Sequence, residues 1–483
     1  MLEKIKALEA VARQLQPPAE QRQVWTQAML QYTEQFLDKL EELPAFVLSQ
    51  DQGRGLLQAD IREEGRSFEE LLALIQEHVD TPGANPASPG LLAYIPGGGI
   101  FPAAIGDYLA AVTDRYAGIF FSGPGAVRME NQLIRWMCQL VGFPDTALGN
   151  LTSGGSISNL AAIATARDHM KVRSADVERS VIYLSHQAHH SVQKALRIAG
   201  LGEAHLHYLP IDERFRIDAG ALRRAIEADK AQGLRPFLVV ASAGTTDTGA
   251  IDPLDEVGDI AHEHGLWYHV DAAYGGFFLL CPDWRPHFKG IEKADSVTID
   301  PHKSLFLPYG TGALLIKNIE ALSKTHYYVA GYMQDAADAT EEPSPADLSP
   351  ELTKHFRGLR MWLPLQLFGV QPFRAALEEK IWLTRYFYER IGELGFERGP
   401  YPELSVTIYR YVPEEGDANA FNARLIAGAQ QDGRVFLSST TIDGVYWLRM
   451  AILNFRSHLD IVETSLKVLE EQLALQLQQP TTV

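Results

Sequence analysis

The residues whose types and spacing could do chemistry are an aspartate and a lysine that each follow a short apolar run. Asp271 comes directly after the run 266–270, and Lys303 closes the sequence Asp300-Pro301-His302-Lys303 after the run 296–299. A lysine amine can form a Schiff base with an aldehyde, and a carboxylate can keep a pyridine nitrogen protonated. The pair therefore predicts a pyridoxal 5'-phosphate (PLP) cofactor, anchored on Lys303 and faced at its ring nitrogen by Asp271.

The neighbours of both residues favour this interpretation over a solvated lysine and a helix-capping aspartate. Leu305 and Phe306 follow Lys303, and apolar surroundings disfavour the charged form of an amine, as Schiff-base chemistry requires. A carboxylate about 3 Å from a ring nitrogen gains roughly 5 kcal/mol of attraction at an effective dielectric of about 20. Ala273 is small enough to let a flat ring pack against the sheet.

A Gly-Ser turn at residues 152–158 precedes a helical pattern. Glycine allows close approach of a backbone, and a helix N-terminus offers free N–H groups and a positive dipole to a phosphate. An ordinary helix cap would look the same in isolation. The order of this turn, Asp271 and Lys303 along the chain favours a phosphate-binding role.

Three histidines have i, i+3, i+4 spacing, at His186, His189 and His190. Such spacing can present a metal-binding face, but no cysteine or carboxylate accompanies the cluster, so no metal site is expected. A stacking role over the cofactor ring is the better prediction for one histidine of this group.

Composition limits the class of protein. The 483 residues carry a formal charge of −18, which argues against nucleic acid or an anionic membrane as the main partner. Two cysteines and an N-terminus without an apolar signal core favour a reduced, cytoplasmic setting. The length predicts several domains: an N-terminal helical arm (1–85), a large cofactor-binding domain (86–360) and a small C-terminal domain (361–483).

Strand-like and helical segments alternate from about residue 145, which predicts an α/β fold with a mostly parallel central sheet flanked by helices. The expected strands are 181–185, 205–209, 237–243, 266–270, 296–299 and 312–316. Ligands bind outside the carboxyl ends of strands in such sheets, which is where Asp271 and Lys303 fall. Helical patterns at 356–370 and 372–394, followed by strand-like runs at 405–411 and 445–452, predict a small α+β domain.

Three motifs together resemble the group II PLP-dependent amino-acid decarboxylases. They are Asp271-Ala272-Ala273-Tyr274, Asp300-Pro301-His302-Lys303 and Gly244-Thr245-Thr246. The segment Cys281-Pro282-Asp283-Trp284-Arg285 is similar to the aromatic L-amino acid decarboxylase-like branch. The resemblance implies the PLP-dependent transferase fold type I and a homodimer with active sites at the subunit interface.

The resemblance also implies roles for further residues. On the cofactor side, it implies that His189 stacks on the ring and that Thr246 lies near its 3-hydroxyl. It implies that the phosphate is contacted by Ile157, Ser158 and His302. On the substrate side it implies contributions from Tyr94, Pro96, Phe121 and Arg456, with Phe121 reaching the active site of the second subunit and Arg456 binding the substrate carboxylate.

Two positions depart from the family pattern. Asp300 stands where many members carry Asn, and because its charge would repel a phosphate we expect it to point elsewhere. No Tyr lies between Tyr332 and Tyr386, where the family's mobile loop carries the tyrosine that returns a proton after CO2 leaves. Leu348 stands about where that tyrosine is expected. Either Tyr332, a water or a histidine is the acid, or oxygen intercepts the reaction and an aldehyde is released.

We therefore expect a decarboxylase that converts an L-amino acid, preferably aromatic, to the amine, with Lys303, Asp271, His189 and Tyr332 as its catalytic residues. A decarboxylating aldehyde synthase is the chief alternative. An aminotransferase, or a PLP-binding regulatory protein without turnover, would also use the same anchor.

Overall fold

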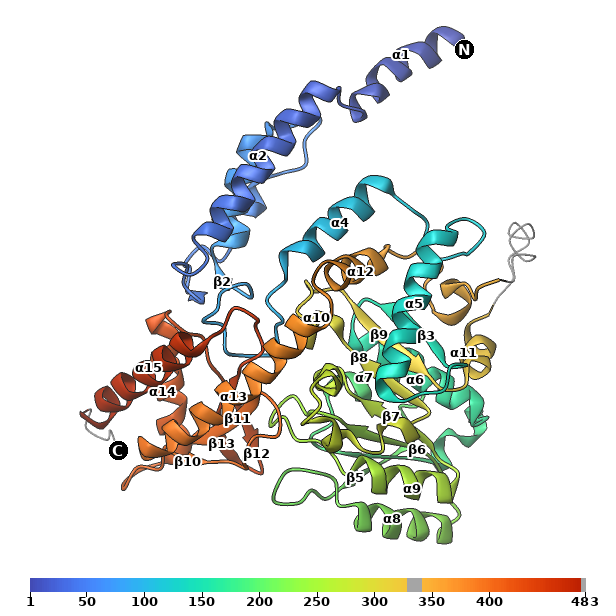
Figure 1. Ribbon diagram of the computed structural model, residues 1–483, viewed down its shortest axis with the longest axis vertical. Coiled ribbons are helices and arrows are strands. Elements are labelled where there is room, and N and C mark those ends of the chain that lie inside the picture. Colours follow the sequence, from blue (N-terminus) through green and yellow to red (C-terminus); the bar gives the residue numbers. More distant parts are fainter. Residues whose placement is uncertain (328–340, 479–483) are drawn as a thin grey trace.

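A seven-stranded sheet forms the centre of the computed structural model, which describes residues 1–327 and 341–478 (Figure 1). In spatial order its strands are β3 (Leu148–Thr152), β9 (Gly312–Ile316), β8 (Ser296–Ile299), β7 (Trp267–Asp271), β6 (Arg235–Ser242), β4 (Ser180–Ser185) and β5 (His205–Leu209). Every strand predicted from the sequence in this region is present, within two residues of its expected ends.

Strand direction brings six carboxyl ends to one edge of the sheet. The pairs β4–β5, β4–β6, β6–β7 and β7–β8 are parallel, whereas β9 is antiparallel to both β8 and β3. Two reversals restore direction, so β3 points the same way as β8. The turn after β3, Asp271 at the end of β7 and Asp300 after β8 therefore meet at the same edge.

Helices cover both faces of the sheet, as the near-continuous burial of its strands requires. They are α5 (Pro124–Val141), α6 (Gly155–His169), α7 (His190–Ile198), α8 (Ala219–Ala231), α9 (Leu254–His264), α10 (Pro301–Ser304) and α11 (Ile319–His326). One continuous apolar core joins them to the sheet.

A second, smaller body carries a four-stranded antiparallel sheet and its own apolar core. Its strands, in spatial order, are β10 (Glu397–Arg398), β11 (Val406–Arg410), β13 (Val445–Ala451) and β12 (Ser438–Ile442). Its helices are α13 (Gln371–Glu393), α14 (Ala418–Asp432) and α15 (Leu459–Gln478), with α12 (Arg357–Phe368) leading in from the large domain. Figure 1 shows the small sheet with α13, α14 and α15 in orange and red, and α12 beside α4 (Phe101–Thr113).

The N-terminal arm projects away from both bodies (Figure 1). It contains α1 (Leu2–Ala12), α2 (Ala19–Asp38) and α3 (Phe68–Ile75), with a two-residue pairing of β1 (Phe46–Val47) and β2 (Gly83–Ala84), and α4 (Phe101–Thr113) follows it. None of these first three helices buries a residue within the described chain. In residues 1–327 and 341–478, no helix combines the length and the apolar character needed to cross a lipid bilayer.

Candidate active site

A cavity of about 420 Å³ opens at the carboxyl edge of the large sheet. Its size is typical of a small-molecule site. Seven of the residues predicted from the sequence line it, namely Ile157, His189, Thr246, Asp271, Ala273, His302 and Lys303. Parallel strands and the turns after them therefore assemble one pocket from segments between Ser153 and Gly310.

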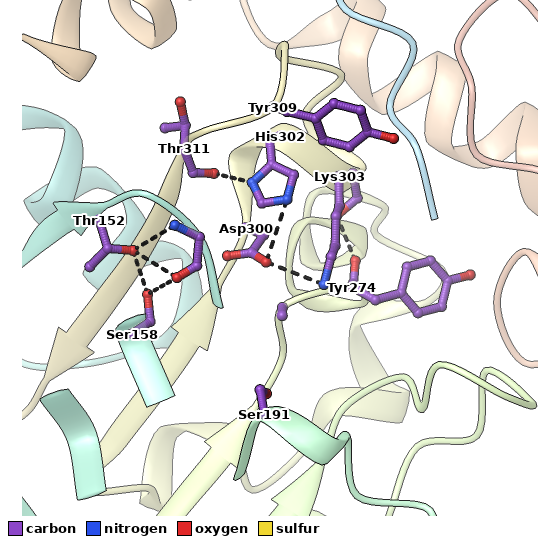
Figure 2. A network of polar contacts seen from close by, with 12 residues as sticks. Thr152, Ser158, Ser191, Tyr274, Asp300, His302, Lys303, Tyr309 and Thr311 are labelled. Carbon is purple, nitrogen blue, oxygen red and sulfur yellow. Dashed lines mark hydrogen bonds and ion pairs between the residues drawn. The ribbon is translucent and has the colours of Figure 1, made fainter. Parts of the chain in front are cut away.

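Lys303 projects from α10 into the cavity beside a buried carboxylate, as Figure 2 shows. Its Nζ lies 3.2 Å from Oδ2 of Asp300, and Asp300 is 1% exposed. His302 Nε2 lies 3.9 Å from the same oxygen, while its Nδ1 contacts the carbonyl of Thr311 at 2.6 Å. The prediction that Asp300 points away from the phosphate-binding turn is therefore wrong, because a side chain on Gly155 of that turn would begin 2.8 Å from Asp300 Oδ2, and the same carboxylate faces the anchor lysine.

Asp271 ends β7 with both carboxylate oxygens engaged by neutral donors. The side-chain amide of Asn159 donates to Oδ2 at 2.9 Å, and the backbone N–H of Ala273 donates to Oδ1 at 3.1 Å. Donors of this kind stabilise the ionised form of a buried carboxylate without cancelling its charge. The arrangement suits a carboxylate that must attract a protonated ring nitrogen.

The turn between β3 and α6 is shaped for close approach. Gly154 has φ +155°, and a side chain on Gly155 would lie 2.8 Å from Asp300 Oδ2 and 3.3 Å from Ala273. The hydroxyl of Ser158 contacts Thr152 Oγ1 at 2.8 Å and does not line the cavity. The N–H of Ile157 donates to Gly154 O at 3.0 Å. Residues 153–157, which form the turn and the start of α6, border the cavity.

Two histidines line the cavity together with the lysine, and the pKa of each is lowered from its ordinary value. Burial is the main cause of the lowered His189 pKa, and the charge of Asp271 opposes it. Burial likewise lowers the His302 pKa, opposed by Asp300. His189 also caps the N-terminus of α7, because its ring accepts a hydrogen bond from the N–H of Ser191 at 3.3 Å. Both rings are therefore largely uncharged near neutral pH.

Thr246 is held in place by an arginine of the small domain. Nε and Nη2 of Arg449, on β13, donate to the Thr246 carbonyl at 2.9 and 2.6 Å. The same guanidinium donates to the carbonyl of Tyr94 at 3.1 Å and to Ser438 Oγ at 3.1 Å. Burial lowers the Arg449 pKa to about 10. This side chain links the two domains at the cavity.

The residues predicted for the substrate side lie outside the cavity lining of the single chain. The side chains of Tyr94 and Phe121 are 59% and 60% exposed, and Pro96 is buried. Arg456 donates to the carbonyl of Gly98 at 2.6 Å, and burial lowers its pKa. Tyr332 lies outside the described residues. The substrate roles of these residues stay predictions.

Leu348 does not occupy the position of a mobile-loop acid. It ends the short helix η9 (Pro345–Leu348), is 1% exposed and packs in the main apolar core. Its carbonyl accepts a hydrogen bond from the Asn150 side chain on β3. Sequence position alone suggested the match, and the structure corrects it, because a core side chain cannot reach a substrate.

Several cavity residues were missed by the sequence interpretation. They include Asn159, Gln187, Ser191 and Tyr309. Asn159 lies four residues beyond the start of α6, on the face that packs toward β7 and β8. The helical spacing from the glycine turn was the available signal, since one turn of helix returns to the same face.

The residues present fit PLP. A single cavity is surrounded by a lysine amine, a carboxylate held by N–H donors and a helix N-terminus. Any side chain in place of Gly155 would crowd that N-terminus. When bound, PLP supplies the electron sink that lets a carboxylate leave an α-carbon. The fold and the site define a PLP-dependent enzyme of fold type I.

Comparison with known proteins narrows this class. Residues 51–398 match the pyridoxal-dependent decarboxylase conserved domain, so the chain belongs to the pyridoxal-dependent decarboxylase family. It is a PLP-dependent amino-acid decarboxylase of the group II, aromatic L-amino acid decarboxylase-like kind.

Individual relatives agree with this assignment. The aromatic-L-amino-acid decarboxylase of Bacillus atrophaeus is 34% identical over 84% of this chain and 85% of its own. A phenylacetaldehyde synthase of Petunia hybrida is 30% identical over 76% of each chain. The crystal structure of Oryza sativa TDC with PLP and tryptamine has a TM-score of 0.90 at 24% identity, covering 95% of this chain and 99% of the other, which supports the fold.

Proposed function

We propose that this enzyme removes CO2 from an aromatic L-amino acid and releases the corresponding amine. The observation that carries the proposal is the meeting of Lys303 and Asp271 in one cavity, in a chain similar to an aromatic-L-amino-acid decarboxylase over most of its length. Further relatives have the names tryptophan decarboxylase and tyrosine decarboxylase. These names support an aromatic substrate.

In this proposal the cofactor-facing residues divide the work by position. Lys303 anchors PLP, Asp271 holds a proton on its ring nitrogen, and His189 stacks on the ring. Thr246 and Ala273 flank the ring, while Ile157, Ser158 and His302 face the phosphate. The cavity lining supports each of these roles except that of Ser158, whose hydroxyl is directed at Thr152.

The substrate side is proposed to be completed by residues beyond the lining of one chain. Tyr94, Pro96 and Phe121 contribute apolar surface, Arg456 receives the substrate carboxylate, and Tyr332 returns the proton to the α-carbon. The exposure of Tyr94 and Phe121 supports their availability to a ligand or a second subunit.

We infer that the active unit is a homodimer. Apolar side chains are exposed along α1, at Leu2, Ile5, Leu8 and Val11, and along α4, at Ile105, Tyr108, Leu109 and Val112. Patches of this kind mark association surfaces, and a second copy of the chain can cover the exposed faces of both helices.

Light scattering should give twice the mass of one chain. Val112→Glu should yield monomer, whereas Leu475→Glu, at an exposed site on α15, should stay dimeric; monomeric wild type would refute the inference.

Substrate class is tested by incubating the PLP-loaded enzyme with each L-amino acid and measuring CO2 and amine. Tryptophan, tyrosine and phenylalanine should release both in equal amounts. Turnover confined to acidic amino acids, or keto acid formed without CO2, would overturn the proposal.

An aldehyde-forming variant of the reaction is a second candidate. Two observations favour it: the absence of a tyrosine between Tyr332 and Tyr386 in the sequence, and the similarity to phenylacetaldehyde synthases. In that reaction the amino acid, O2 and water give aldehyde, CO2, ammonia and hydrogen peroxide. Peroxide equal to CO2 would establish it, and amine without peroxide would exclude it.

We also propose a cytoplasmic location. Cys138 and Cys281 are both free and buried, and a reduced compartment suits such thiols. Cell fractionation with an antibody to the chain tests this location, and enrichment in a secreted fraction would refute it.

A further inference from the structure

A line of buried hydrogen bonds runs behind the cofactor-facing residues, from an indole to an asparagine. The Trp267 Nε1–H donates to Ser296 Oγ at 2.9 Å. Ser296 Oγ contacts His269 Nδ1 at 2.8 Å, and His269 Nε2 contacts Asn159 Oδ1 at 3.0 Å. All four side chains are at most 3% exposed, so water does not compete for these bonds.

The hydrogen-bond network branches at Asn159 toward two residues of the site, Asp271 and His189. Its Nδ2 donates to Asp271 Oδ2 at 2.9 Å and to Ser191 Oγ at 3.0 Å, and Ser191 Oγ contacts His189 Nδ1 at 2.7 Å. Its Oδ1 accepts from Thr298 Oγ1 at 2.7 Å as well as facing His269. An amide has two donor hydrogens and two acceptor positions, so every hydrogen-bonding position of Asn159 is used.

The direction of each bond in the line follows from its ends. Asp271 can only accept, which keeps the Asn159 NH2 group on its carboxylate and turns Oδ1 toward His269 Nε2. Because Oδ1 can only accept, the proton of His269 is on Nε2. In the neutral ring Nδ1 then accepts from the Ser296 hydroxyl, whose oxygen accepts from the Trp267 indole. Burial lowers the His269 pKa to about 4, so this histidine stays neutral near physiological pH.

We propose that Asn159 is a positioning residue that orients Asp271 and His189 through one amide, so that the carboxylate assigned to the ring nitrogen and the imidazole assigned to the ring face are set together. The inference deepens the proposed function and rests on the cofactor roles given there to Asp271 and His189. It accounts for a buried asparagine with no spare hydrogen-bonding group within a helix, where an apolar residue would pack more simply.

Three variants separate the branches of the network. Asn159→Ala removes both branches, Ser191→Ala cuts the branch to His189, and Asn159→Asp keeps the shape but sets a second carboxylate against Asp271. Two carboxyl groups at that distance share a proton, which weakens the charge facing the ring nitrogen. Asn422→Ala is the matched control, because Asn422 is a buried asparagine on α14 in the small domain whose side chain makes three hydrogen bonds.

The main measurement is the ¹⁵N chemical shift of the pyridine nitrogen in ¹⁵N-labelled PLP bound to each variant. Wild type, Ser191→Ala and Asn422→Ala should give the protonated signal. Asn159→Ala and Asn159→Asp should move it toward the unprotonated value, and Asn159→Asp should add a new titration step. Loss of one bond to a charged group should lower kcat tenfold to a hundredfold in Asn159→Ala, with KM changed far less.

A second measurement needs no cofactor. In the apoprotein with ¹⁵N-labelled histidine, the His269 signals should be those of the neutral Nε2–H form from pH 8 to pH 5. A signal from the Nδ1–H form would overturn the assigned directions. Should Asn159→Ala fold poorly, the ring-nitrogen result for the isosteric Asn159→Asp decides the case.

The outcomes distinguish this inference from the proposed function. If wild type binds PLP with a protonated ring nitrogen and releases CO2, but both Asn159 variants keep the wild-type ring signal, the positioning role is wrong and the function stands. If wild type shows no bound PLP or an unprotonated ring, the role proposed for Asp271 fails first.

Discussion

Two sets of residues around the cavity differ in how they are held. The inner network, defined as Asn159, Ser191, His269, Asp271 and Thr298, is linked by hydrogen bonds of 2.7 to 3.0 Å within the large domain. The exposed aromatic set, defined as Tyr94, Phe121 and Tyr309, has side chains 58% to 60% exposed. One set has its hydrogen-bond partners already, and the other is available for new contacts.

The difference indicates that a single chain organises the cofactor side by itself and leaves the substrate side to be completed. Buried, saturated networks resist rearrangement, because breaking one bond leaves a polar group without water. Exposed aromatic side chains can instead contribute binding surface to a ligand or a second subunit. Substitutions in the two sets should therefore differ in size and in kind.

The largest effect is expected at the cofactor anchor. Lys303→Ala should abolish the visible absorbance of bound PLP and lower CO2 release to the limit of detection, because no other amine replaces the covalent link. Lys289→Ala, at an exposed lysine paired with Asp255, should leave both unchanged. A Lys303→Ala protein that kept the absorbance band after dialysis would contradict the assignment of the cofactor side.

Leu348→Tyr should have the next largest effect, and it should lower the stability of the folded protein. A tyrosine there overfills the core and buries a hydroxyl, which should lower the free energy of unfolding by roughly 3 kcal/mol in urea denaturation. The ratio of amine to aldehyde should stay at its wild-type value. A shift of that ratio toward amine in folded protein would mean that this segment reaches the substrate.

His269 should make the inner network sensitive to acid. A pKa of about 4 in the folded state and about 6.5 unfolded means that the unfolded chain binds the proton first as pH falls, so stability is lost below about pH 6.5. At pH 5 this amounts to roughly 2 kcal/mol relative to pH 7. His269→Gln should remove that part of the pH dependence in urea titrations, and an unchanged slope would show that His269 titrates normally.

The smallest stability change is expected in the exposed aromatic set. Phe121→Ala should alter the free energy of unfolding of the isolated chain by less than about 0.5 kcal/mol, because the side chain is mostly exposed. Its effect should fall on KM in the proposed dimer. If Phe121→Ala unfolded the protein while leaving KM intact, the contrast between the two sets would be lost.

Much of the scaffold was predictable because parallel strands carry continuous apolar runs. Those runs located β4 to β9 and placed Asp271 and Lys303 at one edge. β3 was not foreseen, since Gly149 and Asn150 interrupt its apolar pattern, yet the strand is fully buried. Tertiary packing against β9 overrides its weak local preference.

Positions fixed by tertiary contact were the ones that sequence reasoning could not supply. Asn159 looks like any polar helical residue until α6 packs beside β7, and Leu348 looks like a loop residue until it enters the core. The family resemblance implied a role for Arg456 at the substrate carboxylate, and the sequence could not show that its guanidinium also donates to the carbonyl of Gly98. The domain divisions after residues 85 and 360 stay predictions.

Arg449 limits how the enzyme can open. Swinging the small domain as a rigid body would strip a buried guanidinium of its bonds to Thr246 and Tyr94, which would cost several kcal/mol. Hinge bending between the domains is therefore disfavoured, and a path to the cavity that leaves these bonds in place is the less costly one for substrate and product.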